Sequence, residues 1–324
     1  MTPSSPVPRI SICIASWNTR ELLRDCLSSI YADPESTAWE VLVVDNGSED
    51  GSPAMVAEAF PRVRLTALGT NLGFVGGINL ALSQARGRHL VLLNSDTRVE
   101  AGALGAVASF LDGHPAAGVA GPCLVTASGA LQLSCGRAPG PGWEIVNKLL
   151  LHKILPVHRF GRWDHAEARE VGWVTGACLM VRREVVEQVG PLDPAIFMFY
   201  EDLEWCLRIR RSGWQVWYCP AGRVVHLGGQ STRKDFTRML VISQGSQYYL
   251  YRKHFGRGAL HLLRLLTVAE VILRTLLWGP VAVIRSSRRT EARQRLAAYG
   301  QILRRTLGDR AFWDPVGCTP RADS

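Results

Sequence analysis

Residues 89–98 (HLVLLNSDTR) constrain the fold of this 324-residue chain more than any other segment. Four consecutive aliphatic residues follow the turn-forming Gly87 and end at the polar segment 94–96. Such a run is typical of a strand buried on both faces of a parallel sheet. Open α/β sheets bind ligands at the carboxyl ends of their strands. We therefore expect Asp96 either to bind a divalent cation beside a phosphate or to cap a helix over 99–111.

A second acidic side chain follows another apolar run. The segment WEVLVV at 39–44 ends at Asp45 and the turn-forming segment 46–48. In nucleotide-binding folds, an acid at this place commonly meets a ribose or a base. The structural alternative is an Asx turn that leads into a helix over 53–60. Because two strands of one sheet would end in acids, we interpret Asp45 as a nucleotide contact.

Strand and helix patterns alternate as far as Leu111, which implies a doubly wound, mostly parallel sheet. An apolar run at 10–15 begins the pattern, and 63–68 forms a third strand. Glycines at 73, 76 and 77 precede a helical segment, so backbone amides at that helix start are predicted to approach a phosphate closely. The chain contains no GxxxxGK[ST] phosphate loop, HExxH zinc motif or GxSxG nucleophile elbow.

Two further clusters of polar residues lie downstream of a strand predicted over 171–183. Glu201 and Asp202 begin a helix behind an aromatic cluster. First-turn acids favour the helix dipole, but burial there also raises the pKa of a carboxylate toward that of a general base. His226 lies in a glycine-rich loop after the next strand. A single His is usually structural, yet imidazole also joins carboxylate and phosphate oxygens around Mn²⁺.

The C-terminal region combines an apolar stretch with basic charge. The chain has 37 basic and 28 acidic residues, which favours anionic partners. Arginines crowd the region after the apolar segment 260–284, an arrangement that suits lipid headgroups better than nucleic acid; a solvated helix face is the alternative. Glu270 and Arg274 are spaced to pair on one helix face. We therefore favour an interfacial or re-entrant helix pair over a membrane span.

Cysteine usage and the N-terminus indicate the compartment. The eight cysteines are scattered without a CxxC pair, as expected for free thiols in a reducing compartment. The first residues, MTPSSPVPRI, lack the apolar core of a signal peptide. We expect a cytoplasmic protein that is peripheral on the inner face of the cell membrane.

Six segments occur in the order found in family 2 glycosyltransferases of the GT-A fold, and the chain resembles their bacterial rhamnosyltransferase branch. The resemblance covers roughly residues 9–255, and the ordered set is specific although each motif is weak alone. The segments are VVDNGS at 43–48, NLGFVGGIN at 71–79, LLNSDT at 92–97, GACLMVRR at 176–183, FYEDLEWCLR at 199–208 and VVHLGG at 224–229.

The resemblance implies roles for individual residues. Asp202 would be the catalytic base, Asp45 a nucleoside contact, and Asp96 the acid that binds Mg²⁺ or Mn²⁺. His226 would be a further metal or diphosphate contact. The DXD-like motif carries only one carboxylate, which departs from the usual pattern. The residues implied to bind the nucleotide or donor are Ser16, Asn18, Asp45, Asn71, Gly73, Asn79, Asn94 and Asp96, and those on the acceptor side are Trp173, Gly176 and Glu201.

We thus expect an α/β GT-A domain at 9–235, a disordered tail at 1–8, a membrane-associated helical region at 236–310 and a flexible tail at 311–324. The expected activity is inverting transfer of L-rhamnose from dTDP-L-rhamnose to a hydroxyl of a lipid-linked or cell-envelope glycan. The alternatives are a UDP- or GDP-sugar transferase and a non-catalytic nucleotide-sugar or glycan-binding protein. A nucleotidyltransferase is disfavoured, because ASWNTRELL after the first strand contains no glycine.

Overall fold

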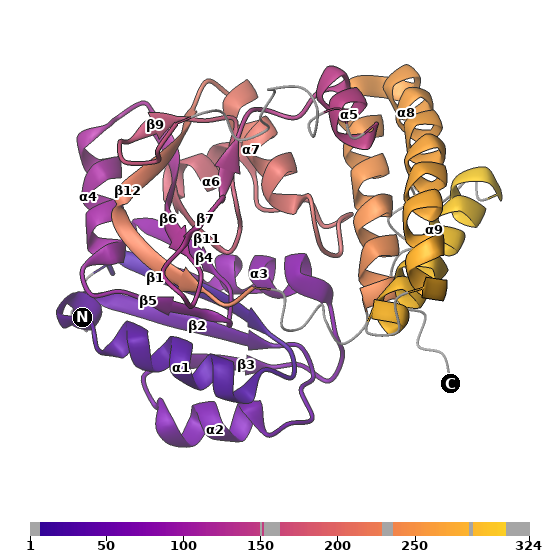
Figure 1. The fold of residues 1–324 in the computed structure, drawn as a ribbon. Coiled ribbons are helices and arrows are strands. Elements are labelled where there is room, and N and C mark those ends of the chain that lie inside the picture. Colours follow the sequence, from indigo (N-terminus) through magenta and orange to yellow (C-terminus); the bar gives the residue numbers. More distant parts are fainter. Residues whose placement is uncertain (1–6, 150, 152–162, 229–235, 285–287, 309–324) are drawn as a thin grey trace. The chain divides into compact units, whose positions relative to one another are not determined.

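The computed structural model describes residues 7–149, 151, 163–228, 236–284 and 288–308 (Figure 1). These residues fall into two compact units. Unit 1 consists of the described residues of Met1–Ala138, Arg162–Pro194 and Glu201–Ser231, and unit 2 of those of Pro139–Gly161, Ala195–Tyr200 and Thr232–Ser324. Most of the N-terminal tail predicted over 1–8, and all of the tail predicted over 311–324, lie outside the described residues.

Unit 1 is an α/β unit in which strands and helices alternate over the first half. Its first elements are β1 (Ile10–Ser16), α1 (Arg20–Tyr31), η1 (Pro34–Ala38), β2 (Trp39–Asp45), α2 (Ser52–Ala59), β3 (Arg64–Ala67), α3 (Gly73–Gln84) and β4 (His89–Leu93). Then follow β5 (Thr97–Val99), α4 (Ala103–Gly113), β6 (Ala117–Val125), β7 (Leu131–Gln132) and β8 (Cys135–Gly136). The remaining ones are β9 (Arg169–Glu170), β10 (Trp173–Val174), β11 (Cys178–Arg182), α6 (Arg183–Val189), α7 (Glu201–Arg211) and β12 (Gln215–His226).

The large sheet of unit 1 has the order β3-β2-β1-β4-β11-β6-β12-β5, with β7 on β6 and β9 on β12. Strands β3, β2, β1 and β4 are parallel, as the apolar runs predict. The other half is mixed, because β11 is antiparallel to both β4 and β6, and β5 is antiparallel to β12. A separate small sheet joins β8 and β10. Figure 1 shows α1 and α2 lying along one side of the parallel half.

Aliphatic side chains on both faces of the parallel strands form the core of unit 1. Every residue of β4 is buried, as are Ile12 on the adjacent β1 and Val43 on β2. Helix α1 contributes Leu23 and Leu27, four residues apart on one face. Because each such side chain stabilises the fold by about 1.5–3 kcal/mol when buried, the register of these strands is strongly fixed.

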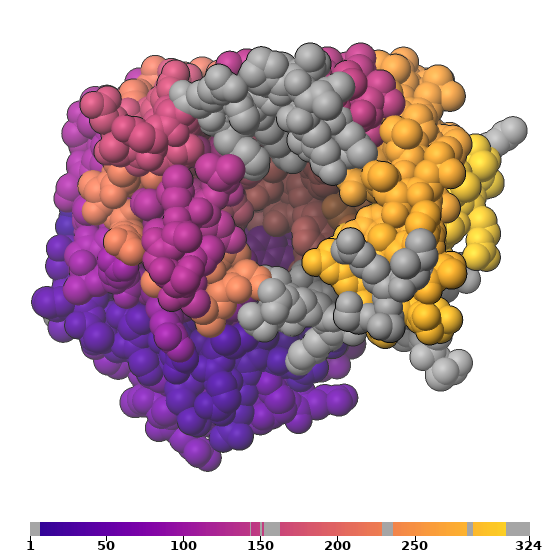
Figure 2. All heavy atoms as spheres, in the orientation of Figure 1, coloured from indigo at the N-terminus to yellow at the C-terminus, as the bar shows by residue number. Residues whose placement is uncertain are grey.

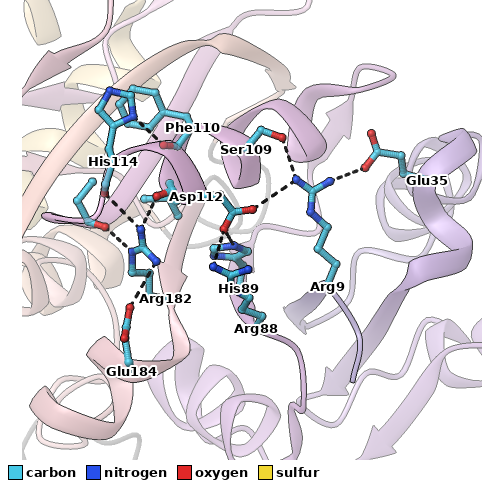
Figure 3. A network of polar contacts seen from close by, with 12 residues as sticks. Arg9, Glu35, Arg88, His89, Ser109, Phe110, Asp112, His114, Arg182 and Glu184 are labelled. Atoms are coloured by element: carbon cyan, nitrogen blue, oxygen red, sulfur yellow. Dashed lines mark hydrogen bonds and ion pairs between the residues drawn. The ribbon is translucent and has the colours of Figure 1, made fainter. Parts of the chain in front are cut away.

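A network of charged side chains lies at the amino ends of the central parallel strands (Figure 3). His89 begins β4 and is fully buried, and its Nε2 lies 2.9 Å from Asp112 Oδ1. Arg182, opposite His89 in the antiparallel pair, donates through Nε to Ala117 O at 2.8 Å and through its guanidinium to Leu111 O near the end of α4. A cation at a helix C-terminus satisfies carbonyls that have no intrahelical partner. The opposite, carboxyl edge of the sheet carries the polar loops.

Three local predictions were wrong in their boundaries. The helix expected over 99–111 begins only at Ala103, as α4, because residues 97–99 first pair with β12 as strand β5. The single strand expected over 171–183 is divided by a turn into β10 and β11, which belong to different sheets. His226 is the last residue of β12 rather than part of a loop, since pairing with β5 and β6 extends that strand past Cys219.

Unit 2 is helical. Its elements are α5 (Pro141–Lys148), α8 (Phe236–Ile284) and α9 (Arg289–Gly308). Helix α8 is interrupted at Gly256, where φ is 82°. The sequence predicts that the aromatic-rich segment 247–255 ends at this glycine. The predicted pair of Glu270 and Arg274 is confirmed, with Nε and Oε1 2.8 Å apart. The sequence also predicts an amphipathic helix over 143–155; α5 covers its first part, and residues 150 and 152–155 lie outside the described residues.

The helices of the described ranges do not meet the requirements of a membrane span. None of them is both long enough and apolar enough to cross a bilayer. The seven cysteines in these ranges are free thiols, in agreement with the prediction for them, and Cys318 lies outside the described residues.

Candidate active site

Asp45 ends β2 with its side chain buried and only half satisfied. Its Oδ1 accepts the backbone N–H of Ser48 at 2.8 Å, so the Asx-turn interpretation is correct for one oxygen. Its Oδ2 is also buried and has no hydrogen-bond partner among the described residues. Leaving a buried acceptor unsatisfied is costly, and native structures rarely do so without reason. This oxygen is therefore suited to accept a hydrogen bond from a ligand.

A chain of hydroxyl groups joins the carboxyl ends of the neighbouring strands. Ser16 and Thr19 hydroxyls lie 2.9 Å apart, and Thr19 contacts the Ser95 hydroxyl at 3.0 Å. Asn18 adopts a left-handed φ of 52°, and its Oδ1 accepts the N–H of Glu49 at 2.8 Å. Ser16 and Asn18 thus fix the loops around Asp45, on the edge where the sequence predicts a nucleotide.

The polar residues before and within α3 are held by the chain itself. Asn71 Oδ1 accepts the N–H of Gly73 at 2.8 Å, and Gly73 has a φ of 77° that suits glycine. Asn79 donates to Leu192 O at 2.8 Å and accepts Leu192 N–H at 3.1 Å. The structure therefore gives Asn71 and Asn79 clear positioning contacts, and direct donor binding by them remains a prediction.

Asp96 and His226 meet because β5 pairs with the end of β12. Thr97, directly after Asp96, lies opposite His226 in this antiparallel pair. Asp96 Oδ1 is 3.3 Å from His226 Nε2, and each side chain is 12% exposed. Asn94 Nδ2 lies 3.4 Å from the same nitrogen. Helix α4 is preceded by Gly102 at its N-cap, so the alternative of Asp96 as a helix cap is excluded.

The spacing of these two side chains fits a shared cation. Two adjacent ligands about 2.1 Å from an octahedral ion lie about 3 Å from each other, close to the observed 3.3 Å. In the described part of the chain, no group of three or more His, Cys, Asp and Glu side chains is arranged to hold a metal. A cation at Asp96 and His226 would take its other ligands from phosphate and water, which is how Mg²⁺ is commonly bound.

Glu201 and Asp202 begin α7 in different environments. Asp202 Oδ2 accepts the N–H of Gly176 at 3.0 Å, and its Oδ1 accepts the N–H of Leu203 at 2.8 Å. Glu201 is 8% exposed, and its buried Oε2 has no hydrogen-bond partner in the described ranges. The two preceding residues, Phe199 and Tyr200, have left-handed φ values of 66° and 64°. Such backbone is costly for large side chains and is often found at functional sites.

The pKa values of both carboxyl groups are raised. Burial, together with the smaller effect of the adjacent Asp202 charge, raises the pKa of Glu201 to about 8. Burial also raises the pKa of Asp202, but the N–H groups of Gly176 and Leu203 stabilise its charged form. Glu201 is thus the more readily protonated of the two, while two backbone N–H groups hold the charged form of Asp202.

The remaining residues of the predicted acceptor side lie on the β10–β11 turn. Trp173 is buried in β10. A Cβ atom at Gly176 would lie 3.7 Å from Asp202 Cβ, 3.8 Å from Phe74 Cε1 and 3.9 Å from Glu201 Oε1. Gly176 thus lies between α3 and the two acids. The sequence motif NLGFVGGIN includes Phe74 but does not indicate that its ring approaches Gly176.

Solved structures of similar fold are glycosyltransferases. One is the mannosyltransferase PcManGT from Pyrobaculum calidifontis in complex with GDP-Man and Mn²⁺; it is 18% identical with a TM-score of 0.57, and the match covers 94% of this chain and 89% of that one. Another is GalNAc-T7 with UDP, GalNAc and Mn²⁺, 14% identical with a TM-score of 0.55, over 76% of this chain and 51% of that one. The fold is therefore that of the GT-A glycosyltransferases, as predicted.

The family follows from sequence similarity. Residues 11–190 match the family model described as Glycosyl transferase family 2. A relative from Mycobacterium tuberculosis, N-acetylglucosaminyl-diphospho-decaprenol L-rhamnosyltransferase, is 30% identical over 239 residues, which cover 67% of this chain and 76% of the relative. A low-salt glycan biosynthesis hexosyltransferase of Haloferax volcanii is 24% identical over 67% of this chain and 66% of its own length. The chain belongs to glycosyl transferase family 2.

The protonation of Glu201 predicts how stability depends on pH. Its pKa is raised from 4.5 to about 8 in the folded chain, so the folded state binds this proton more tightly than the unfolded state. The resulting stability is complete below the unfolded pKa and is lost as the pH rises through about 8. We expect Glu201→Gln to remove this loss, which amounts to at most about 1.4 kcal/mol per pH unit.

Urea unfolding of both proteins across this pH range measures the effect. The matched control is Glu184→Gln, because the Glu184 side chain is 59% exposed. It should leave the pH dependence of the unfolding free energy as in the parent chain. An unchanged pH dependence in Glu201→Gln would show that Glu201 is ionised in the folded protein.

Proposed function

We propose that this glycosyltransferase is inverting and moves L-rhamnose from dTDP-L-rhamnose to a hydroxyl of a lipid-linked or cell-envelope glycan. The observation that carries the proposal is the half-buried Asp202 carboxylate, held by Gly176 N–H next to the buried Glu201, whose pKa is raised. The choice of donor is supported by the name of the mycobacterial relative, an L-rhamnosyltransferase. A UDP- or GDP-sugar is the alternative donor.

Asp202 would act as the general base. It takes the proton of the acceptor hydroxyl as that oxygen attacks the anomeric carbon of the donor sugar. The bond between this carbon and the diphosphate oxygen breaks, and its electron pair leaves with the nucleoside diphosphate. Attack from the face opposite the leaving group inverts the anomeric centre. Glu201 remains neutral, so that only one negative charge lies near the incoming hydroxyl.

The nucleotide would lie along the carboxyl ends of β1, β2 and β4. The unpaired Oδ2 of Asp45 accepts a hydrogen bond from the nucleoside. Asp96 and His226 would hold Mg²⁺ or Mn²⁺, which when bound neutralises the charge of the departing diphosphate. For that reason one ionised carboxylate suffices at the reaction centre, whereas glycosidases need a pair of acids.

Removal of the base tests the activity. We expect Asp202→Asn to lower the rate of rhamnosyl transfer from dTDP-L-rhamnose about 10²- to 10⁴-fold, because an amide cannot accept the hydroxyl proton. Binding of dTDP should be unchanged, since Asp202 has no part in holding the nucleotide. The matched control is Asp25→Asn, an exposed carboxylate paired with Arg98 on the surface.

This assay tests the role of Asp202 and the identity of the donor sugar separately. Near-normal turnover by Asp202→Asn would refute its role as the base. Transfer by the parent protein from a UDP- or GDP-sugar but not from dTDP-L-rhamnose would keep the base and reject rhamnose.

An apolar face on α8 supports peripheral membrane binding. Exposed aliphatic residues of its second half lie mostly three, four or seven positions apart, which places them on one face of the helix. Helices α8 and α9 are orange and yellow in Figure 2. Glu270 is neutralised inside unit 2 by Lys148 at 2.9 Å and by Arg274. Exposed arginines at 288, 289 and 293 follow, which suits anionic headgroups. The exposed aliphatic residues are Leu262, Leu265, Ile272, Leu273, Leu276, Leu277 and Val283.

We propose on these grounds that the protein works in the cytoplasm, bound to the inner face of the cell membrane. The double substitution of Leu265→Glu and Leu276→Glu should weaken binding to anionic liposomes at least about tenfold, because two apolar side chains no longer enter the interface. Leu307→Glu on α9, at an equally exposed leucine, is the matched control. Equal liposome binding by the double variant and the parent protein, or none by the parent, would contradict this placement.

A further inference from the structure

Gln132 lies beside the candidate cation site although no sequence motif includes it. It ends the two-residue strand β7, which pairs with the end of β6. On its other side, β6 pairs with β12, so that Leu124 lies between Gln132 and Val224. His226 follows two residues later on β12. From this position, Gln132 Oε1 reaches to 3.1 Å from His226 Nδ1.

Two contacts define which nitrogen of His226 carries the hydrogen in the neutral ring. The amide oxygen of Gln132 can only accept, so His226 Nδ1 must donate to it. The amide nitrogen of Asn94 can only donate, and it lies 3.4 Å from Nε2. Both contacts require a hydrogen on Nδ1 and a lone pair on Nε2. The lone pair faces Asp96 Oδ1, 3.3 Å away.

The other tautomer would block the site. With its hydrogen on Nε2, the ring would donate directly to Asp96, and the two side chains would satisfy each other. A cation could then bind only after that hydrogen bond had been broken and the proton moved. With the hydrogen on Nδ1, neither Nε2 nor Oδ1 carries a hydrogen, and a cation has to displace only the 3.4 Å contact of Asn94 with Nε2. Partners that fix a ligating imidazole in this way commonly increase metal affinity.

We propose that Gln132 is a positioning residue that holds His226 as the Nδ1–H tautomer and so presents Nε2, together with Asp96, to a divalent cation. The inference rests on the cation site of the proposed function. It adds a residue outside the predicted set, with a role that acts through His226 rather than on the sugar or the nucleotide.

The tautomer can be measured without nucleotide, metal or turnover. Nitrogen chemical shifts of ¹⁵N-histidine-labelled protein, at a pH of about 8.5 where ordinary imidazoles are neutral, distinguish the two ring nitrogens. His226→Gln identifies the signal. We expect the parent protein to carry hydrogen on Nδ1 and Gln132→Leu to lose this preference, while Gln132→Glu retains it because a carboxylate also accepts. The signals of the buried His89 and His165 report whether each variant is folded.

Hydrogen on Nε2 in the parent protein, or an unchanged tautomer in Gln132→Leu, would overturn the proposal. A second measurement uses Mn²⁺ with dTDP and follows the paramagnetic broadening of the His226 signal. Gln132→Leu should weaken Mn²⁺ binding about 10- to 100-fold, and equal binding by both proteins would also overturn the proposal. If the parent protein does not bind Mn²⁺ at all, the cation site of the proposed function fails, and the tautomer measurement alone decides the role of Gln132.

Discussion

The candidate site depends on the antiparallel strand β11, which joins the two halves of the sheet of unit 1. It pairs with β4 on one side and with β6 on the other. Just before it, Ala177 O accepts the N–H of Asn94 at 3.0 Å, and Gly176 N–H donates to Asp202. The loop that carries Asp96 and the carboxylate predicted to act as base thereby both contact the two adjacent residues that precede β11. Parallel strands alone would bring the nucleotide-binding acids together but would leave Asp202 without this connection.

The parallel half of the fold was predictable because its signal is local. Continuous apolar runs ending in Asp45 and Asp96 indicate buried strands and place both acids on one edge. The second half was less predictable, since its boundaries depend on pairing between distant segments. Residues 97–99 extend as a strand only because β12 lies beside them, and the same pairing makes His226 the end of a strand. Neither effect is visible in the periodicity of the sequence.

The site shows the same division between local and distant information. The importance of Asp45, Asp96 and Asp202 was predicted from their place after strands or at a helix start, and the structure shows what surrounds each. The sequence predicts a raised carboxyl pKa behind the aromatic cluster, but it does not reveal that burial beside Asp202 raises the pKa of Glu201 to about 8. The sequence did not indicate a role for Gln132, because a single polar residue in a two-residue strand is common. Its contact with His226 depends on the fold. Asn71 and Asn79, by contrast, form backbone contacts that the motif alone does not reveal.

The proposed activity requires that the carboxyl edge of this sheet bind a nucleoside diphosphate with a cation at Asp96. The most direct measurement is the unfolding temperature of the purified protein with dTDP, UDP or GDP, with and without Mn²⁺, because a ligand that binds only the folded state stabilises it by about 2.7 kcal/mol at a hundredfold excess over Kd. We expect dTDP to raise the unfolding temperature and Mn²⁺ to increase this rise. Asp96→Asn should abolish the increase caused by Mn²⁺. No shift with any of the three nucleotides, in the presence or absence of Mn²⁺, would contradict the proposed activity.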